Sequence, residues 1–217
     1  NTYYNKTISI EVKEPYETMG PMIMHYYGLG GKVEIPATLG ATEIYEYAFS
    51  NCKYIEKNLE EGDVITEEDP LNTKPSYIGD DTITEIVIPE GIKTIGSYAF
   101  AGLTKLEKVT LPSTLVNIGM GAFEGCTSLK LVAGLENVKF INSKAFRDCD
   151  LTGDYSLDSV IAISNSAFEN NKSLTGIVLP ESAHSIGSKV FKGCEALESV
   201  EFKSEKIKLG EYAFENC

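Results

Sequence analysis

The chain has 217 residues, of which 42% are hydrophobic and 24% charged, and its formal net charge is −13. This composition supports a sizeable core, and one elongated domain is expected. The acidic balance excludes nucleic acid and anionic membrane surfaces as partners because both require a basic patch, and no apolar run is long enough to insert into a membrane.

The first segment, residues 1–25, contains alternating apolar residues at Ile8, Ile10 and Val12. This alternation predicts a strand. A strand here would cover the open end of the structure that follows. We therefore expect a capping segment over 1–25 and a repeat domain over 26–217.

Seven Ala-Phe or Val-Phe pairs recur along the repeat domain, with phenylalanines at Phe49, Phe100, Phe123, Phe146, Phe168, Phe191 and Phe214. From Phe100 onward the steps are 23, 23, 22, 23 and 23 residues. A fixed period of this length indicates stacked solenoid coils. The rings are predicted to stack in the core, and a ligand channel lined by aromatic residues is the disfavoured alternative.

The interval between Phe49 and Phe100 is 51 residues, and the excess falls in the segment 56–81, which is rich in Asp and Glu. We interpret this segment as an inserted acidic loop. A calcium site or a contact with a basic partner is the functional alternative. A solvated excursion is favoured because the segment lacks the D-x-[DN]-x-[DN]-G frame of a calcium loop.

Each repeat predicts a short strand followed by a turn. In 106–111 the apolar residues Val109 and Leu111 alternate with other types, and Pro112 ends the strand. A glycine recurs four residues before the phenylalanine, which we interpret as a position of positive φ, at Gly96, Gly119, Gly187 and Gly210. Stacked strands of this kind would form one parallel sheet.

Two central repeats depart from the pattern. Gly134 and Leu135 replace the usual Leu-Pro pair, and the next repeat is one residue short, with Asp154 and Ser156 at positions that are normally apolar. We expect the sheet to bend or loosen locally at these repeats.

Five cysteines each lie three residues after a repeat phenylalanine, at Cys52, Cys126, Cys149, Cys194 and Cys217. Leu103 and Asn171 occupy the same position in the other two repeats, which indicates a packing position. Disulfides between neighbouring coils or a metal cluster are the alternatives, but the chain has no Cys-x-x-Cys motif and only two histidines. Free buried thiols are therefore predicted, with no disulfide and no metal site.

The frame Ile95-Gly-Ser-Tyr-Ala-Phe100 through Leu106-Glu-Lys-Val109-Thr-Leu111-Pro112 resembles the leucine-rich repeat of BspA-like bacterial surface proteins, and the resemblance covers residues 26–217. It implies an α/β solenoid: a right-handed leucine-rich repeat superhelix of about seven 23-residue repeats, with one parallel sheet and short helical or 3-10 turns. It also implies a secreted or cell-surface bacterial protein that acts in adhesion and has no enzymatic activity.

By the same resemblance, ligands would bind the concave sheet, at positions between the inward residues. We predict a binding surface there, with an apolar contact patch centred on Leu131, Tyr155 and Val178. Strand propensity alone would also place such residues on an ordinary sheet surface. The predicted binding residues are Val87, Thr110, Leu131, Ala133, Tyr155, Val178 and Glu201.

Catalytic motifs are not recognisable. Neither His25 nor His184 lies in a nucleophile frame, and the chain has no G-x-S-x-G elbow and no phosphate-binding glycine loop. No enzyme activity and no cofactor are expected, although a pair of carboxylates that hydrolyses glycans stays an alternative. The leading prediction is a monomeric scaffold that binds a host or bacterial surface protein, with a glycan as the alternative partner, and the main alternative function is a passive stalk that displays other domains.

Overall fold

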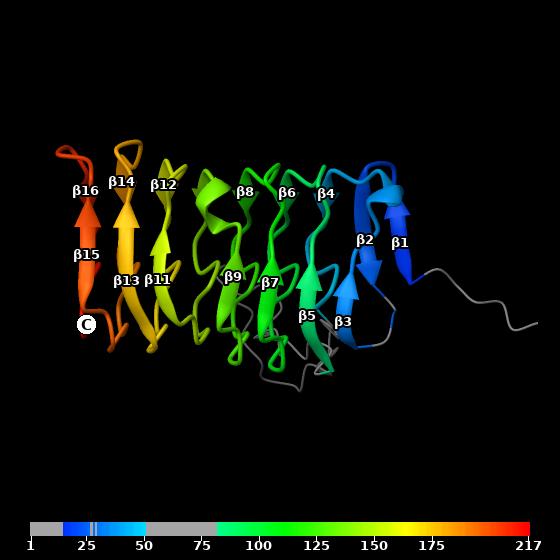
Figure 1. Cartoon of the computed structure of the whole chain (residues 1–217), viewed down its shortest axis with the longest axis horizontal. Helices are drawn as coiled ribbons and strands as arrows, with labels where there is room; N and C mark the ends of the chain where they lie inside the picture. The colour runs from blue at the N-terminus through cyan, green and yellow to red at the C-terminus, as the bar shows by residue number, and fades with distance from the viewer. Residues whose placement is uncertain (1–14, 27, 29, 51–81) are drawn as a thin grey trace, which may run out of the picture.

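A computed structural model describes residues 15–26, 28, 30–50 and 82–217. Within these residues the chain winds into coils that stack along one axis, which Figure 1 shows as a row of strands running across the long dimension. The predicted strand around Ile8 to Val12, the acidic insertion 56–81 and Cys52 lie outside the described residues.

One wall of the solenoid is a sheet of nine short strands within the described ranges. Neighbours pair in parallel except β1 and β2, which form an antiparallel hairpin at the N-terminal edge. In each later coil the second strand residue is a buried aliphatic residue, except for the exposed Leu209. In spatial order the strands are β1 (Tyr16–Met19), β2 (Met22–Tyr26), β4 (Glu43–Ile44), β6 (Thr94–Ile95), β8 (Asn117–Ile118), β10 (Phe140–Ile141), β12 (Ala162–Ile163), β14 (Ser185–Ile186) and β16 (Lys208–Leu209).

The other wall consists of longer strands in two separate parallel sheets. The first contains β3 (Gly31–Glu34), β5 (Ile83–Val87), β7 (Lys108–Thr110) and β9 (Leu131–Ala133). The second contains β11 (Gly153–Ser156), β13 (Leu174–Leu179) and β15 (Ser199–Phe202). The expectation of a single parallel sheet is therefore wrong, because each coil contributes two extended segments that bury apolar side chains from opposite walls.

The break between β9 and β11 falls at the two irregular repeats, where loosening of the sheet was predicted. Tyr155 occupies this break, and its hydroxyl accepts a hydrogen bond from Val132 N at 3.3 Å and donates one to Lys130 O at 3.2 Å. The phenol thus reaches backbone groups of β9 at a point where β11 does not pair with that strand.

The outward orientation predicted for Tyr155 is wrong, because the side chain is only 8% exposed. A register shift between Gly153 and Asp154 pairs Tyr155 with the inward Ile177 and moves Ser156 into the outward column. Asp154 and Ser156 therefore face solvent and leave no polar gap in the core. The missing residue of this repeat follows the strand, and the alternation of Tyr155 with the buried Leu157 was the sequence signal for this register.

The turns contain almost no helix. The described residues include two 3-10 turns, η1 (Ala37–Leu39) and η2 (Leu135–Asn137), and no α-helix. The helical part of the predicted α/β class is not confirmed, and the right-handed winding stays a prediction.

The core is organised around the predicted stack of phenylalanine rings. Successive ring centroids from Phe49 to Phe214 are 4.7 to 5.5 Å apart. The five rings from Phe100 to Phe191 are fully buried. At the N-terminal end Tyr26 stacks on Phe49 at 4.9 Å, and Tyr16 packs against Tyr26 at 5.2 Å, so that the β1–β2 hairpin extends the stack.

Candidate functional site

Most of the predicted binding column lies on the outer face of the long strands. Val87, Thr110 and Ala133 are aligned neighbours on β5, β7 and β9, and all three are half-buried. Val178 and Glu201 are neighbours on β13 and β15, beyond the sheet break. The structure therefore brings Val87, Thr110 and Ala133 together and separates this group from Val178 and Glu201.

A second outward column runs beside the first. Leu131 on β9 is 46% exposed and lies next to Lys108, whose Nζ lies 3.1 Å from Glu85 Oε1. We call the group Val87, Thr110, Leu131 and Ala133 the wide-face patch. Its centre is apolar and its edge carries an ion pair, an arrangement that can contact a protein surface but offers no reactive group.

A hollow of about 530 Å³ lies on the other wall. Glu43, Glu46, Asn117 and Asn142 provide polar side chains, and Tyr45, Met120 and three hydroxyl side chains complete much of the lining. None of the predicted binding residues lines this hollow. Two glycines of the column that recurs in the repeats, Gly96 and Gly119, are also part of its lining.

Close approach between coils explains this glycine column. A Cβ on Gly119 would lie 2.6 Å from the backbone of Gly96, and one on Gly96 would lie 2.6 Å from Glu46 N. The predicted positive φ at these glycines is wrong. Positive φ instead occurs two residues before and two residues after the phenylalanines, mostly at non-glycine residues such as Tyr98, Lys144 and Asp148.

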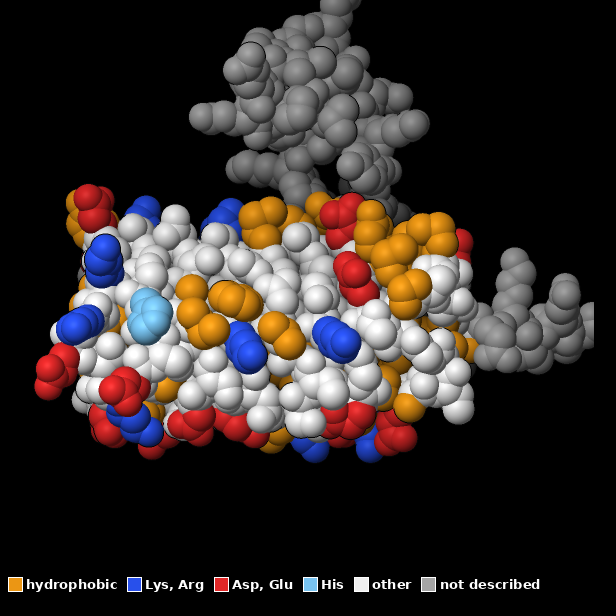
Figure 2. All heavy atoms as spheres, turned by 90° about the horizontal axis from the view of Figure 1, so that it is seen from above, with side chains coloured by type: hydrophobic (Ala, Val, Ile, Leu, Met, Phe, Trp, Pro, Cys, Tyr) orange, Lys and Arg blue, Asp and Glu red, His pale blue; other side chains and the backbone are white. Residues whose placement is uncertain are grey.

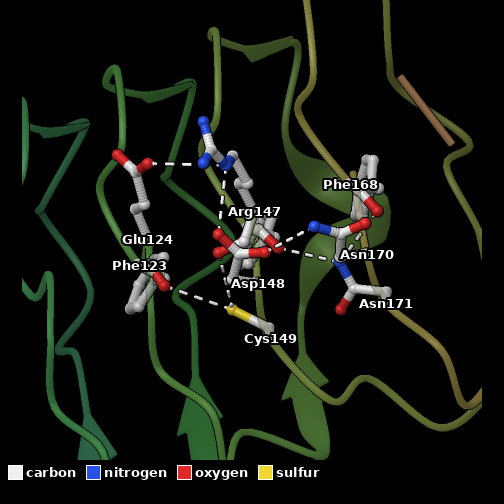
Figure 3. Close-up of polar contacts among 9 residues, drawn as sticks. Phe123, Glu124, Arg147, Asp148, Cys149, Phe168, Asn170 and Asn171 are labelled. Carbon is white, nitrogen blue, oxygen red and sulfur yellow. Dashed lines mark hydrogen bonds and ion pairs between the residues drawn. The ribbon is translucent and has the colours of Figure 1, made fainter. Parts of the chain in front are cut away.

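A polar ladder follows the turn edge near the middle of the solenoid (Figure 3). The Arg147 Nε atom lies 3.0 Å from Asp148 Oδ2 and 3.7 Å from Glu124 Oε1. Asn170 Nδ2 donates to Asp148 Oδ1 at 2.6 Å. Burial raises the pKa of Glu124 despite the nearby cations of Lys144 and Arg147. These contacts join successive coils and hold their register.

The cysteine column is part of the same packing. Four of the five cysteines are described and free, and all but Cys217 are buried. Each of the four Sγ atoms donates to the carbonyl of a phenylalanine 26 residues earlier, at 3.1 to 3.3 Å. Burial raises the pKa of Cys149, and raises that of Cys194 to about 12. Such thiols are poor nucleophiles at neutral pH.

Within the described ranges no group of three or more His, Cys, Asp or Glu side chains is placed to hold a metal ion. The same residues include no helix with the length and hydrophobicity needed to cross a bilayer.

Comparison with known families gives one match over most of the chain. A family model described as "BspA type Leucine rich repeat region" matches in six copies, over residues 3–67, 75–170 and 161–217. No curated protein matches the chain.

Several solved bacterial proteins are similar in structure. A leucine-rich repeat protein of Treponema pallidum, TpLRR, is 26% identical with a TM-score of 0.72, over 90% of this chain and 80% of that one. A leucine-rich cell surface protein of Faecalibacterium prausnitzii is 27% identical with a TM-score of 0.55, and the match covers 85% of this chain and half of that one. A leucine-rich repeat protein of Bacteroides ovatus shares the fold with a TM-score of 0.52. It is 24% identical, and the match covers 94% of this chain and 60% of that one.

Proposed function

Because the chain belongs to the family of BspA-type leucine-rich repeat proteins, we propose that it is a non-enzymatic scaffold on the bacterial cell surface that binds a protein partner. The partner would be a host or bacterial surface protein, and the scaffold would act as a monomer. The description of the Faecalibacterium prausnitzii neighbour as a cell surface protein supports this location.

The observation that carries the proposal is the exposure of Leu131 in the wide-face patch. A leucine that is 46% exposed stands out from the half-buried Val87, Thr110 and Ala133 around it. Aliphatic side chains surrounded by small residues and bordered by charges supply the buried centre of many protein interfaces. The ion pair between Lys108 and Glu85 would lie at the rim of such a contact.

The test is the substitution Leu131→Glu in binding measurements against immobilised host extracellular-matrix proteins and bacterial surface proteins. We expect saturable binding by the unaltered protein and at least about tenfold weaker binding by the variant, since a central anchor typically contributes more than about 1 kcal/mol. Met19→Glu is the matched control because Met19 is 58% exposed on β1, outside the patch. Equal binding by Leu131→Glu and the unaltered protein would refute the assignment.

A stalk that displays other domains is the second candidate function. The regular stack of rings favours it, because ring spacing of 4.7 to 5.5 Å is maintained from Phe49 to Phe214 and a continuous core stiffens a rod. The same binding measurements separate the two functions: a stalk shows no saturable partner, whatever residue occupies position 131.

A further inference from the structure

A line of basic and aliphatic side chains runs along the wall of short strands, away from the wide-face patch. Its members are the residues just before β6, β8, β10, β12 and β14, and we call them the basic ridge: Lys93, Val116, Lys139, Ile161 and His184. From Val116 onward, each backbone N–H in the ridge donates to the carbonyl of the preceding member, at 2.9 to 3.0 Å. The five residues therefore lie side by side, one in each coil.

The ridge alternates in chemistry from coil to coil. Lys93, Lys139 and His184 are exposed, whereas Val116 and Ile161 between them are half-buried. Figure 2 shows the resulting row, in which a histidine, hydrophobic side chains and lysines follow one another along the long axis of the molecule. Neighbouring coils are about 4.8 Å apart, so the basic side chains recur about every 9.6 Å.

The two lysines are available to a ligand. Neither Lys93 nor Lys139 forms an ion pair with any described residue. The first residues of the same five strands form the next column, on the side toward the hollow, and none of them is charged. They are Thr94, Asn117, Phe140, Ala162 and Ser185. Phe140 is 40% exposed immediately after Lys139 and pairs with Asn117, which lines the hollow.

We infer that the basic ridge binds an acidic polysaccharide of the host extracellular matrix, in which a uronic acid alternates with a neutral amino sugar. The uronate carboxylates would face Lys93 and Lys139, and the neutral sugars would lie over the aliphatic positions between them. Phe140 offers an apolar face to a sugar ring, and Asn117 and Thr94 offer hydrogen-bonding groups to its hydroxyls. This inference goes beyond the proposed protein binding because it uses a different wall and a different ligand class.

The spacing and the overall charge argue against other polyanions. Residues on one face of an extended peptide recur about every 6.8 Å, about 3 Å less than the spacing between neighbouring basic positions of the ridge. DNA carries a phosphate about every 3.4 Å along each strand. The net charge of −13 would repel so dense a polyanion from the rest of the surface.

The test is calorimetric titration with hyaluronan oligosaccharides at physiological ionic strength, with variants first checked by circular dichroism and thermal melting. We expect saturable binding, weakened about two- to fivefold by Lys93→Ala or Lys139→Ala and about five- to twentyfold by the double substitution. Lys105→Ala is the matched control because Lys105 is also exposed and lies outside the ridge. Chitin oligosaccharides, which lack the carboxylate, are expected not to bind.

The inference is overturned if hyaluronan does not bind, if the double substitution leaves its affinity unchanged, or if chitin oligosaccharides, polyglutamate or DNA bind equally well. Leu131→Glu separates this result from the proposed function. It should weaken binding of a protein partner at least about tenfold and leave the affinity for hyaluronan unchanged, so each proposal can fail independently of the other.

Discussion

At the scale of single residues, the cysteine or asparagine three residues after a core phenylalanine satisfies buried backbone groups in a neighbouring coil, whereas Leu103 fills the same position by packing alone. Cys126 and Cys149 donate their thiols to phenylalanine carbonyls. Asn171 replaces cysteine in its coil, where its amide donates to Phe146 O at 2.8 Å and its Oδ1 accepts from Leu151 N at 3.1 Å. A buried asparagine is tolerated here because its donors and its acceptor all find partners.

Removing one ring from the stack should cost more stability than removing an exposed one. Phe146→Ala is expected to lower the free energy of unfolding by about 3 to 5 kcal/mol, because the ring is fully buried between two stacked neighbours and its loss leaves a cavity. Phe140→Ala, in the same coil but 40% exposed, should cost about 1 kcal/mol or less. Urea unfolding measures both, and an unchanged midpoint for Phe146→Ala would contradict its core position.

Thiol reactivity should follow burial. Under native conditions iodoacetamide is expected to modify Cys217 and to spare Cys126, Cys149 and Cys194, since burial limits access and raises the pKa of Cys149 and Cys194. Peptide mass mapping before and after denaturation reads out each site separately. Native modification of Cys194 at the rate of Cys217 would be inconsistent with its packing in the core.

At the scale of elements, a tyrosine takes the place of strand pairing at the break between β9 and β11. Tyr155 lies inward with its hydroxyl on Val132 N and Lys130 O, and burial raises the pKa of that hydroxyl. The carbonyl of Lys130 also accepts a hydrogen bond from Thr152 N at 3.1 Å, so it keeps a partner without the phenol. The N–H of Val132 therefore depends more on the Tyr155 hydroxyl than the Lys130 carbonyl does. The Tyr155 hydroxyl therefore adds a side-chain link across the break to the backbone bonds that Asp150 N and Thr152 N donate to Leu129 O and Lys130 O.

Tyr155→Phe is accordingly a test of structure and not of binding. We expect the free energy of unfolding to fall by about 1 to 3 kcal/mol because Val132 N loses its buried acceptor. Ser156→Ala, the neighbouring exposed substitution, should have little effect. Denaturant unfolding measures the change, and full stability of Tyr155→Phe would show that the hydroxyl is dispensable.

At the scale of the whole molecule, charge is arranged in columns that run along the solenoid. The residues directly after successive phenylalanines alternate in sign, as Glu124, Arg147, Glu169, Lys192 and Glu215. An ion pair joins Arg147 to Glu124, and another joins Lys192 to Glu215. Because unlike charges face each other only when coils are correctly aligned, this column favours the native register over a slipped one.

The pH dependence of stability reveals the cost of burying one member of this column. Burial raises the folded-state pKa of Glu124 above its ordinary value of 4.5. The native state therefore holds this proton more tightly than the unfolded state, and the associated stability is lost as pH rises through the raised pKa. The melting temperature of the unaltered protein, relative to Glu124→Gln, should fall as pH increases from below 4.5 to neutral.

Glu124→Gln is the reference for the unaltered protein because the two differ only in the titrating group at position 124. The two proteins should melt together in acid, where Glu124 is protonated and resembles glutamine. A relative gain by the unaltered protein at neutral pH would mean that attraction to Arg147 outweighs burial.

Much of the fold was predictable because it is periodic. The spacing of Phe100 and Phe123 determines that equivalent side chains stack, and the Ala or Val before each ring is buried. The repeat length alone did not determine the register of Tyr155, since a one-residue deletion can fall before or after the strand and each choice turns the side chain to a different face. Only the local alternation of Tyr155 with Leu157 distinguished the two registers.

The surfaces were less predictable than the core. The prediction named Leu131 and its neighbours correctly as outward residues, but it overlooked the basic ridge, because Lys93, Lys139 and His184 are 46 and 45 residues apart in the sequence and become a row only when coils stack. The positive φ predicted at Gly96 and Gly119 is wrong, because close approach between coils, and not backbone conformation, requires glycine there.

By itself, the sequence determined the repeat, the buried ring stack and the family, because each depends on which apolar side chains recur at a constant interval. Only the tertiary structure decided that the coils have two walls of strands, that the longer strands form two sheets, and which residues share a surface. Those features depend on distances between backbones of different coils, such as the approach of Gly119 to Gly96, and no local preference of a residue encodes such a distance.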